Sequence, residues 1–177
     1  MKLILSSAVL VICIISCKSP MGPGRAVMAN APSPKTAEAM NAIKALAGSW
    51  EGSIAEHNNS PTTAAFAVTS GGSMVREIMG AGTEHEMTNV YHLDGDQIVT
   101  THYCGAGNQP RMVATFVSPR RIVFELESIA NYTGGEHGFM GGVELEFIDK
   151  NHVIQRWTNF KDGKEQGKAT FELKRKK

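Results

Sequence analysis

The stretch Val143-Glu144-Leu145-Glu146-Phe147 alternates apolar and charged residues without a break. In an extended chain successive side chains leave opposite faces, so Val143, Leu145 and Phe147 share one face and the two glutamates share the other. A strand with one apolar and one charged face is typical of an antiparallel sheet that covers a core on one side and meets water on the other. The stretch therefore predicts a half-buried strand.

The same alternation recurs along most of the chain. Ile122, Phe124 and Leu126 share one face of their segment, and turn residues such as Asp94-Gly95 and Asp162-Gly163 separate neighbouring segments. The pattern predicts ten strands, over Ser49–Ala55, Thr62–Thr69, Met74–Met79, Met87–Leu93, Gln97–Cys104, Arg111–Val117, Arg121–Ser128, Gly141–Ile148, His152–Phe160 and Lys164–Leu173.

Strands joined one after another by tight turns form a meander, and a long meander removes its exposed edges by closing. The predicted fold is all-β: an antiparallel up-and-down meander barrel of about ten strands, preceded by one short helix. The helix is expected over Lys35–Ala47, with Thr36 as its N-cap and Gly48 at its end. Because side chains alone fill a barrel of about eight strands, a wider one is expected to hold a small ligand.

The first residues resemble a bacterial lipoprotein signal. Met1-Lys2 is a positive start, and the apolar stretch from Leu3 to Ile15 is shorter than the roughly 20 residues that a membrane span needs. It ends in Ile14-Ile15-Ser16-Cys17, which resembles the lipobox and implies diacylation of Cys17. Two acyl chains anchor a protein stably, so a bacterial envelope lipoprotein, of the outer membrane and facing the periplasm or the cell surface, is expected. The alternative is ordinary secretory cleavage near Ala29 or Ala31.

A tether and a single domain are expected after the signal at residues 1–17. Residues 18–34 hold four of the seven prolines and too little apolar area to offset the entropy of ordering. Residues 35–177 then form the barrel domain. A formal net charge of +1 does not indicate nucleic acid as a partner. With Cys13 removed and Cys17 acylated, only Cys104 remains, so no disulfide is expected.

The segment Leu46-Ala47-Gly48-Ser49-Trp50-Glu51-Gly52 resembles the Gly-x-Trp start of the calycin superfamily, which includes lipocalins, fatty-acid-binding proteins and nitrobindin-like barrels. Within it, the chain is similar to small secreted bacterial lipocalin-like proteins of the DUF1579 type. The resemblance implies that Trp50 closes one end of the barrel under a basic side chain of the last strand, Lys174 or Arg175. It also implies binding of a small hydrophobic molecule, since enzymes are the exception in these families. Haem would need a histidine in that last strand, which has none, and no cofactor is expected.

The densest run of polar and reactive residues is His102–Met112. His102 and Cys104 are two residues apart on an expected strand and so share a face. Asn108 and Arg111 add an amide and a permanent cation able to fix the polar end of a ligand. Three interpretations are open: packed wall residues, the polar rim of a ligand cavity, or a zinc or copper site completed by His92, His85 or His137.

Two further residues have alternative placements. Centring the preceding hairpin on Gly95 puts His92 beside Ile98 or Thr100, and two placements are open: a diagonal neighbour of His102, or an exposed or singly bonded histidine. Arg156 is an interior cation if Ile154 and Phe160 face inward, and it is solvated if Val153 and Trp157 do. An interior arginine would fit a carboxylate ligand such as a fatty acid.

The sequence thus predicts an envelope lipoprotein whose barrel reversibly binds a small, largely apolar molecule. No catalytic residue is assigned. One alternative is an enzyme or metal site centred on His102 and Cys104, and another is an envelope adaptor that binds protein through its outer surface. The ligand-binding candidates are His102, Cys104, Asn108, Arg111, His92 and Arg156.

Overall fold

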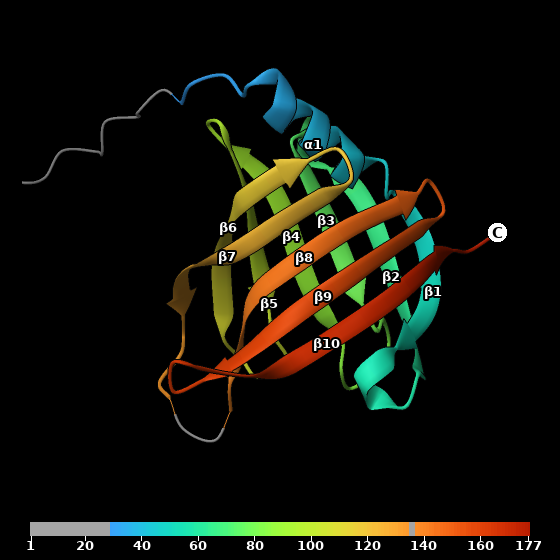
Figure 1. The fold of residues 1–177 in the computed structure, drawn as a ribbon, viewed down its shortest axis with the longest axis vertical. Coiled ribbons are helices and arrows are strands. Elements are labelled where there is room, and N and C mark those ends of the chain that lie inside the picture. Colours follow the sequence, from blue (N-terminus) through green and yellow to red (C-terminus); the bar gives the residue numbers. More distant parts are fainter. Residues whose placement is uncertain (1–28, 135–136) are drawn as a thin grey trace, which may run out of the picture.

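The computed structural model describes residues 29–134 and 137–177 (Figure 1). The predicted signal at residues 1–17, the lipidation of Cys17 and the first part of the tether lie outside these residues. Within the described part of the chain, no helix combines the length and the apolar character that crossing a membrane requires.

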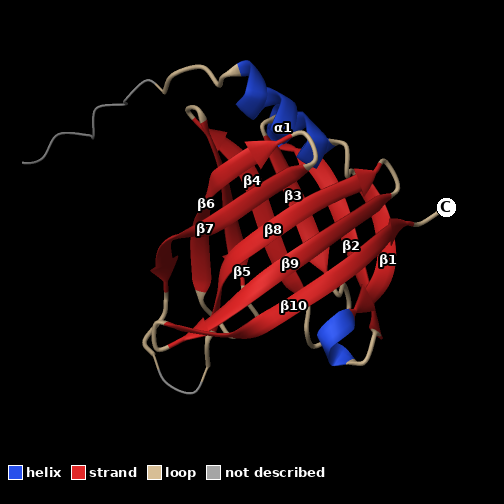
Figure 2. Cartoon of the chain, in the orientation of Figure 1, coloured by secondary structure: helices blue, strands red, loops and turns tan. Residues whose placement is uncertain are grey.

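Ten antiparallel strands form one closed barrel (Figures 1 and 2). Each strand pairs with its neighbours in sequence, and β1 pairs with β10 to complete the ring. The predicted meander barrel is therefore confirmed, and every predicted strand boundary lies within two residues of the observed one. The strands are β1 (Gly48–Ile54), β2 (Ser60–Thr69), β3 (Met74–Met79), β4 (Met87–Asp94), β5 (Gln97–Tyr103), β6 (Gln109–Ser118), β7 (Arg121–Ala130), β8 (Phe139–Asp149), β9 (His152–Lys161) and β10 (Lys164–Arg175).

The helix α1 (Pro34–Lys44) starts and ends earlier than predicted. Its N-cap is Ser33, whose hydroxyl accepts a hydrogen bond from the Thr36 amide, so the prediction of Thr36 as N-cap was wrong. Pro34 suits the first helical position because it has a fixed φ and no amide proton to leave unpaired. The helix stops at Lys44, and Gly48 begins β1 instead of ending the helix.

Helix α1 covers one end of the barrel, called here the upper end (Figure 1). Its inner face, with Met40 and Ile43 fully buried, belongs to the same hydrophobic core as the inward side chains of the strands. The side chain of Thr36 donates to the carbonyl oxygen of Asp96, and the backbone amide of Ser33 donates to the Asp96 carboxylate. The start of the helix is thus attached to the turn between β4 and β5.

Of the two basic residues considered for the last strand, Arg175 is the one that packs on Trp50. The two residues lie opposite each other in β1 and β10, and the guanidinium carbon is 4.4 Å from the centre of the indole ring. The same guanidinium donates to the carbonyl oxygens of Ala45 and Ala47, which follow the end of α1. One side chain therefore joins the first strand, the last strand and the end of the helix.

The two ends of the barrel differ in their connections. At the upper end tight turns join β4 to β5, β6 to β7 and β8 to β9 beside α1. At the lower end the described parts of the connections include the short helical turn η1 (Ala55–His57) and residues 80–86, 104–108, 131–134 and 137–138. Helix α1 covers the upper end, on the side opposite to these connections.

Candidate functional site

A buried glutamate lies at the centre of a polar cluster inside the barrel. Glu77 on β3 is 0% exposed, and its carboxylate accepts hydrogen bonds from three side chains. Asn89 Nδ2 and the Tyr91 hydroxyl, both on β4, lie 2.8 Å from Oε2, and Gln155 Nε2 on β9 lies 2.6 Å from Oε1. Because β9 does not pair with β3, the Gln155 bond spans the barrel interior.

Burial dominates the protonation behaviour of this cluster. Burial raises the pKa of the Glu77 carboxyl, and the hydrogen bonds from Gln155, Asn89 and Tyr91 act in the opposite direction. Burial, together with the neighbouring Glu77 carboxylate, also raises the pKa of Tyr91 well above its ordinary value. The phenol therefore stays protonated and donates a hydrogen bond to Glu77.

His102 on β5 extends the cluster onto the next strand. It lies directly opposite Asn89 in the ladder between β4 and β5, with Nδ1 2.6 Å from Asn89 Oδ1. Its ring packs on Trp157, with 4.8 Å between the ring centres. Burial lowers the pKa of His102 to about 4, so the imidazole is neutral near pH 7.

The hydrogen bonds also fix which nitrogen of His102 carries the proton. Asn89 donates from Nδ2 to Glu77, so its Oδ1 faces His102. The histidine must then donate from Nδ1, which leaves a lone pair on Nε2. His102 Nε2 is buried and has no hydrogen-bond partner among the described residues.

A pocket of about 860 Å³ opens beside this cluster at the lower end of the barrel. Its apolar lining comes from inward positions of neighbouring strands, including Ile54, Met79, Met87 and Phe171. The sulfur of Met79 lies 3.3 Å from Asn89 Nδ2, so the floor of the pocket touches the polar cluster. An apolar pocket that ends at a few directed polar groups is the usual form of a small-molecule site.

Two candidates, Cys104 and Asn108, lie in the lower-end connection after β5. The Cys104 carbonyl oxygen accepts from Gly107, and its amide donates to Asn108, so the half-buried, free Cys104 is held in a tight turn. Asn108 is buried and donates from Nδ2 to the carbonyl oxygen of Gly138. It therefore joins two lower-end connections.

His92 is on the outer face of β4, so it does not approach His102. The hairpin turn has two residues, Gly95 and Asp96, and its centre falls between them rather than on Gly95. His92 consequently pairs with Val99, and the predicted pairing with Ile98 or Thr100 was wrong by one residue. A shift of one residue changes the face of every side chain in a strand.

Arg111 is also on the outer face. It lies opposite Thr101, on the other side of the sheet from the inward His102, and forms ion pairs with Asp94 and Glu127. Its guanidinium is thus already neutralised at the surface, and the structure does not bring Arg111 to the interior cluster.

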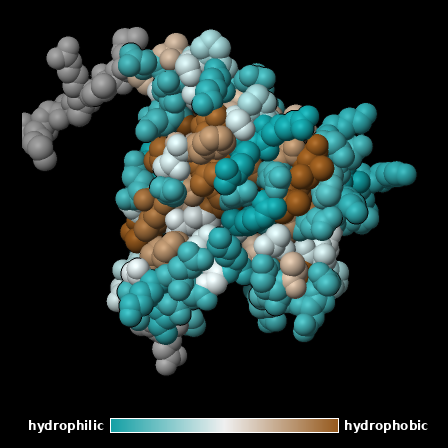
Figure 3. Space-filling view, viewed as in Figure 1, coloured by the Kyte–Doolittle hydropathy of each residue, from teal (hydrophilic) through white to brown (hydrophobic). Residues whose placement is uncertain are grey.

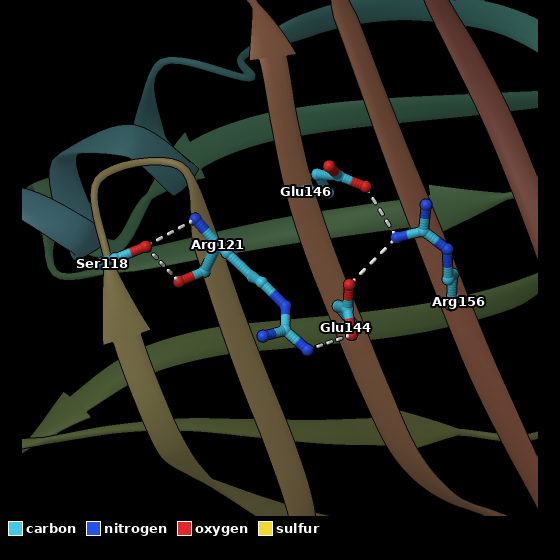
Figure 4. A network of polar contacts seen from close by, with 5 residues as sticks. All are labelled: Ser118, Arg121, Glu144, Glu146 and Arg156. Atoms are coloured by element: carbon cyan, nitrogen blue, oxygen red, sulfur yellow. Dashed lines mark hydrogen bonds and ion pairs between the residues drawn. The ribbon is translucent and has the colours of Figure 1, made fainter.

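Arg156 adopts the solvated one of its two predicted placements. Val153 and Trp157 face inward, and Arg156 points outward between Glu144 and Glu146, at 2.9 and 2.7 Å from their carboxylate oxygens (Figure 4). Figure 4 also shows Arg121 on the far side of Glu144, 2.8 Å from its carboxylate. An interior arginine for a carboxylate ligand is therefore not provided by Arg156.

The outer wall of β7, β8 and β9 carries a second hollow. A groove of about 560 Å³ lies there, lined by residues such as Val123, Glu144 and Phe160. Figure 3 shows apolar and hydrophilic residues side by side on the face that these strands present. This mixture of residue types does not mark a particular patch for the predicted adaptor surface.

The metal interpretation finds no ligand set. In residues 29–134 and 137–177, no group of three or more His, Cys, Asp or Glu side chains is placed to hold a metal ion. His85 lines the pocket with an exposed side chain, His92 is on the outer face, and His137 is exposed. None of the three forms a metal-binding group with His102 and Cys104 among the described residues.

His102 was predicted from the sequence as a site residue, whereas Glu77, Asn89, Tyr91 and Gln155 were not. The available signal was a polar residue at an inward position between two apolar ones. Val75-x-Glu77-x-Met79 and Val153-x-Gln155-x-Trp157 both have this form. In an amphipathic strand such a residue is either a break in the pattern or a buried polar group with a partner.

Comparisons with known proteins support the fold. No known family matches the chain, and no curated protein matches it significantly. Among solved structures, the crystal structure of Rv2717c from M. tuberculosis superposes with a TM-score of 0.52 and 19% sequence identity, over 82% of this chain and 99% of that one. At this identity the similarity extends to the barrel fold, which the two proteins share.

Proposed function

We propose that this protein reversibly binds a small, largely apolar molecule at the lower end of its barrel. The observation that carries the proposal is the pocket of about 860 Å³ whose floor, Met79, touches the buried polar cluster at Asn89. Small-molecule sites typically have volumes of about 300–1,000 Å³. The Gly48-x-Trp50 start and the packing of Arg175 on Trp50 also support a calycin-like, lipocalin-type carrier.

The lining suits an adaptable apolar contact. Met79 and Met87 are unbranched and polarizable, so they adjust to ligands of different shape, and Phe171 and Ile54 supply fixed apolar surface. Burial of about 300 Å² of ligand hydrocarbon would contribute on the order of 7 kcal/mol before binding costs. A free energy of this size corresponds to a dissociation constant of about 10 μM, which is the upper limit of the expected affinity because the costs of association weaken it.

The proposal includes attachment of the carrier to a bacterial envelope membrane. The motivating features are the apolar stretch before Cys17 and the lipobox-like sequence at Ile14–Cys17. Labelling of cells with a radioactive fatty acid should mark the wild-type protein, whereas Cys17→Ala should lose both the label and membrane fractionation. Equal labelling of the two proteins would contradict lipidation at Cys17.

Binding is tested with the purified full chain and a neutral naphthylamine dye that fluoresces in apolar surroundings. We expect saturable binding in the micromolar range. Met87→Trp should weaken it about tenfold or more, because an indole at this half-buried position fills part of the pocket. Val68→Trp is the matched control, since Val68 is exposed on β2 and lines none of the pockets described above. Absence of saturable binding, or equal affinity in both variants, would refute the proposal.

A further inference from the structure

The interior and the exterior of the barrel differ in the charged side chains that they carry. Among the described residues, no lysine or arginine is buried, and Arg111 and Arg156 are both paired with carboxylates on the outer wall. The ionisable groups of the interior cluster are Glu77, His102 and Tyr91. An ionised Glu77 would repel an anionic ligand, and a protonated Glu77 would still offer it no positive charge.

His102 Nε2 is a buried polar atom without a hydrogen-bond partner among the described residues, as is Thr100 Oγ1 on the same inward face of β5. The chain of hydrogen bonds from His102 through Asn89 to Glu77 keeps the ring proton on Nδ1, so Nε2 can accept a hydrogen bond. The ring is also fixed by its contact with Trp157. A buried acceptor without a partner carries an energetic penalty that a donated hydrogen bond would remove.

His102 lies one step deeper in the barrel than the pocket lining. Met87 and Asn89 are two residues apart on β4 and face inward, which separates them by about 7 Å along the strand. His102 lies opposite Asn89, so the pocket floor at Met79 and Met87 separates it from a ligand in the pocket. Both methionines have three rotatable bonds, and their movement would open the remaining distance.

We infer that the barrel selects neutral ligands whose polar end is a hydrogen-bond donor, as in a long-chain alcohol, and that His102 Nε2 is the acceptor that recognises this end. The inference rests on the proposed function, because it takes the apolar pocket as the site of the tail. It departs from a fatty-acid carrier, which would need a cation at the polar end.

The test uses four probes with the same hydrocarbon tail and different polar ends: dodecanol, dodecyl methyl ether, dodecanoate and the hydrocarbon dodecane. Each probe competes with the naphthylamine dye on the unmodified full chain. We expect dodecanol to bind about tenfold more tightly than the ether, which accepts but does not donate, and more tightly still than dodecanoate.

Two substitutions test whether His102 is the acceptor that causes the selectivity. His102→Phe keeps an aromatic ring beside Trp157 and removes the acceptor, so dodecanol should fall to the affinity of the ether. His92→Phe is the matched control, because it makes the same change on the outer face of the neighbouring strand and should leave the order of the probes unchanged. Thermal unfolding checks that both variants are folded. If His102→Phe does not fold, the four probes on the unmodified chain still decide whether the barrel prefers a hydrogen-bond donor.

The outcomes separate the two proposals. If dodecanoate binds as tightly as dodecanol, or the ether equals the alcohol, the donor selectivity is wrong and the apolar carrier stands. If none of the four probes displaces the dye and the dye itself does not bind, the carrier proposal is wrong and the selectivity falls with it. If His102→Phe keeps the full preference for dodecanol, another group is the acceptor and the assignment to His102 is overturned.

Discussion

Glu77 and Glu144 are the same residue type in the same barrel wall, and their environments differ in almost every respect. Glu77 points inward and is held by three neutral donors, whereas Glu144 points outward and pairs with Arg121 and Arg156. Burial raises the pKa of Glu77, and the hydrogen bond and charge of Arg121 lower the pKa of Glu144. The outer carboxylate is therefore stabilised by charge and the inner one by hydrogen bonds alone.

The difference explains why an interior cation is not needed to keep a carboxylate in this barrel. Three donors satisfy both oxygens of Glu77, so the group is retained without an arginine that would itself require desolvation. The arrangement also orders the rest of the interior. Because Asn89 and Gln155 give their amide nitrogens to Glu77, their oxygens are directed to His102 and Trp157.

The largest expected effect is the loss of the inner carboxylate. Glu77→Ala leaves three buried donors without an acceptor and should lower the free energy of unfolding by about 3–5 kcal/mol. Glu144→Ala, the matched change on the outer wall, should cost no more than about 1 kcal/mol because its partners are solvated. Urea unfolding monitored by tryptophan fluorescence measures both. Equal losses would show that the inner network contributes no more than the surface pairs.

The second effect is a pH dependence of stability that comes from His102. The pKa of His102 is lowered from 6.5 in the unfolded chain to about 4 in the fold, so its contribution is complete above pH 6.5 and is lost as the pH falls toward 4. The loss amounts to about 3 kcal/mol relative to a chain without this histidine. Glu77 acts in the opposite sense: because its pKa is raised, its contribution is lost as the pH rises above its ordinary value.

The two contributions are separated by comparing unfolding curves of the wild type and His102→Phe between pH 4 and 7. The difference in unfolding free energy between the two proteins should shrink as the pH falls. His92→Phe, with the same change on the outer face, should follow the wild type. A pH-independent difference would mean that His102 is protonated equally well in the folded and unfolded chain.

The smallest expected effect is on the outer wall. Arg121→Ala should raise the pKa of Glu144 toward its ordinary value, because Arg121 is the main cause of the lowering. The stability should fall only slightly, and 1 M salt should remove most of the difference. A carboxyl titration followed by NMR checks the pKa. If the pKa of Glu144 is unchanged in this variant, Arg156 suffices to stabilise the carboxylate.

Sequence patterns were sufficient for the fold because alternation and turn residues are local. The ten strands follow from runs such as Val143–Phe147, and their boundaries were predicted to within two residues. The cross-strand partner of each side chain depends on the register of the two strands, and one residue more or less in the turn changes that register. His92 was misplaced by one residue in the hairpin at Gly95, so it pairs with Val99 instead of lying beside Ile98 or Thr100.

The inner cluster was beyond the sequence for a different reason. Gln155 and Glu77 are 78 residues apart, and only closure of the barrel brings them together. His102 was singled out because of its neighbour Cys104, yet its contacts are with Asn89 and Trp157. Local spacing identified the right residue, and the tertiary structure supplied its partners.

The attachment of α1 at both of its ends has a consequence for orientation. Ser33 and Thr36 fasten one end to Asp96, and Arg175 fastens the other, so the helix closes the upper end of the barrel as a fixed lid. The chain enters the domain on this closed side (Figure 1). A lipid on Cys17, as proposed above, would join the domain on this closed side, opposite the end at which the pocket opens.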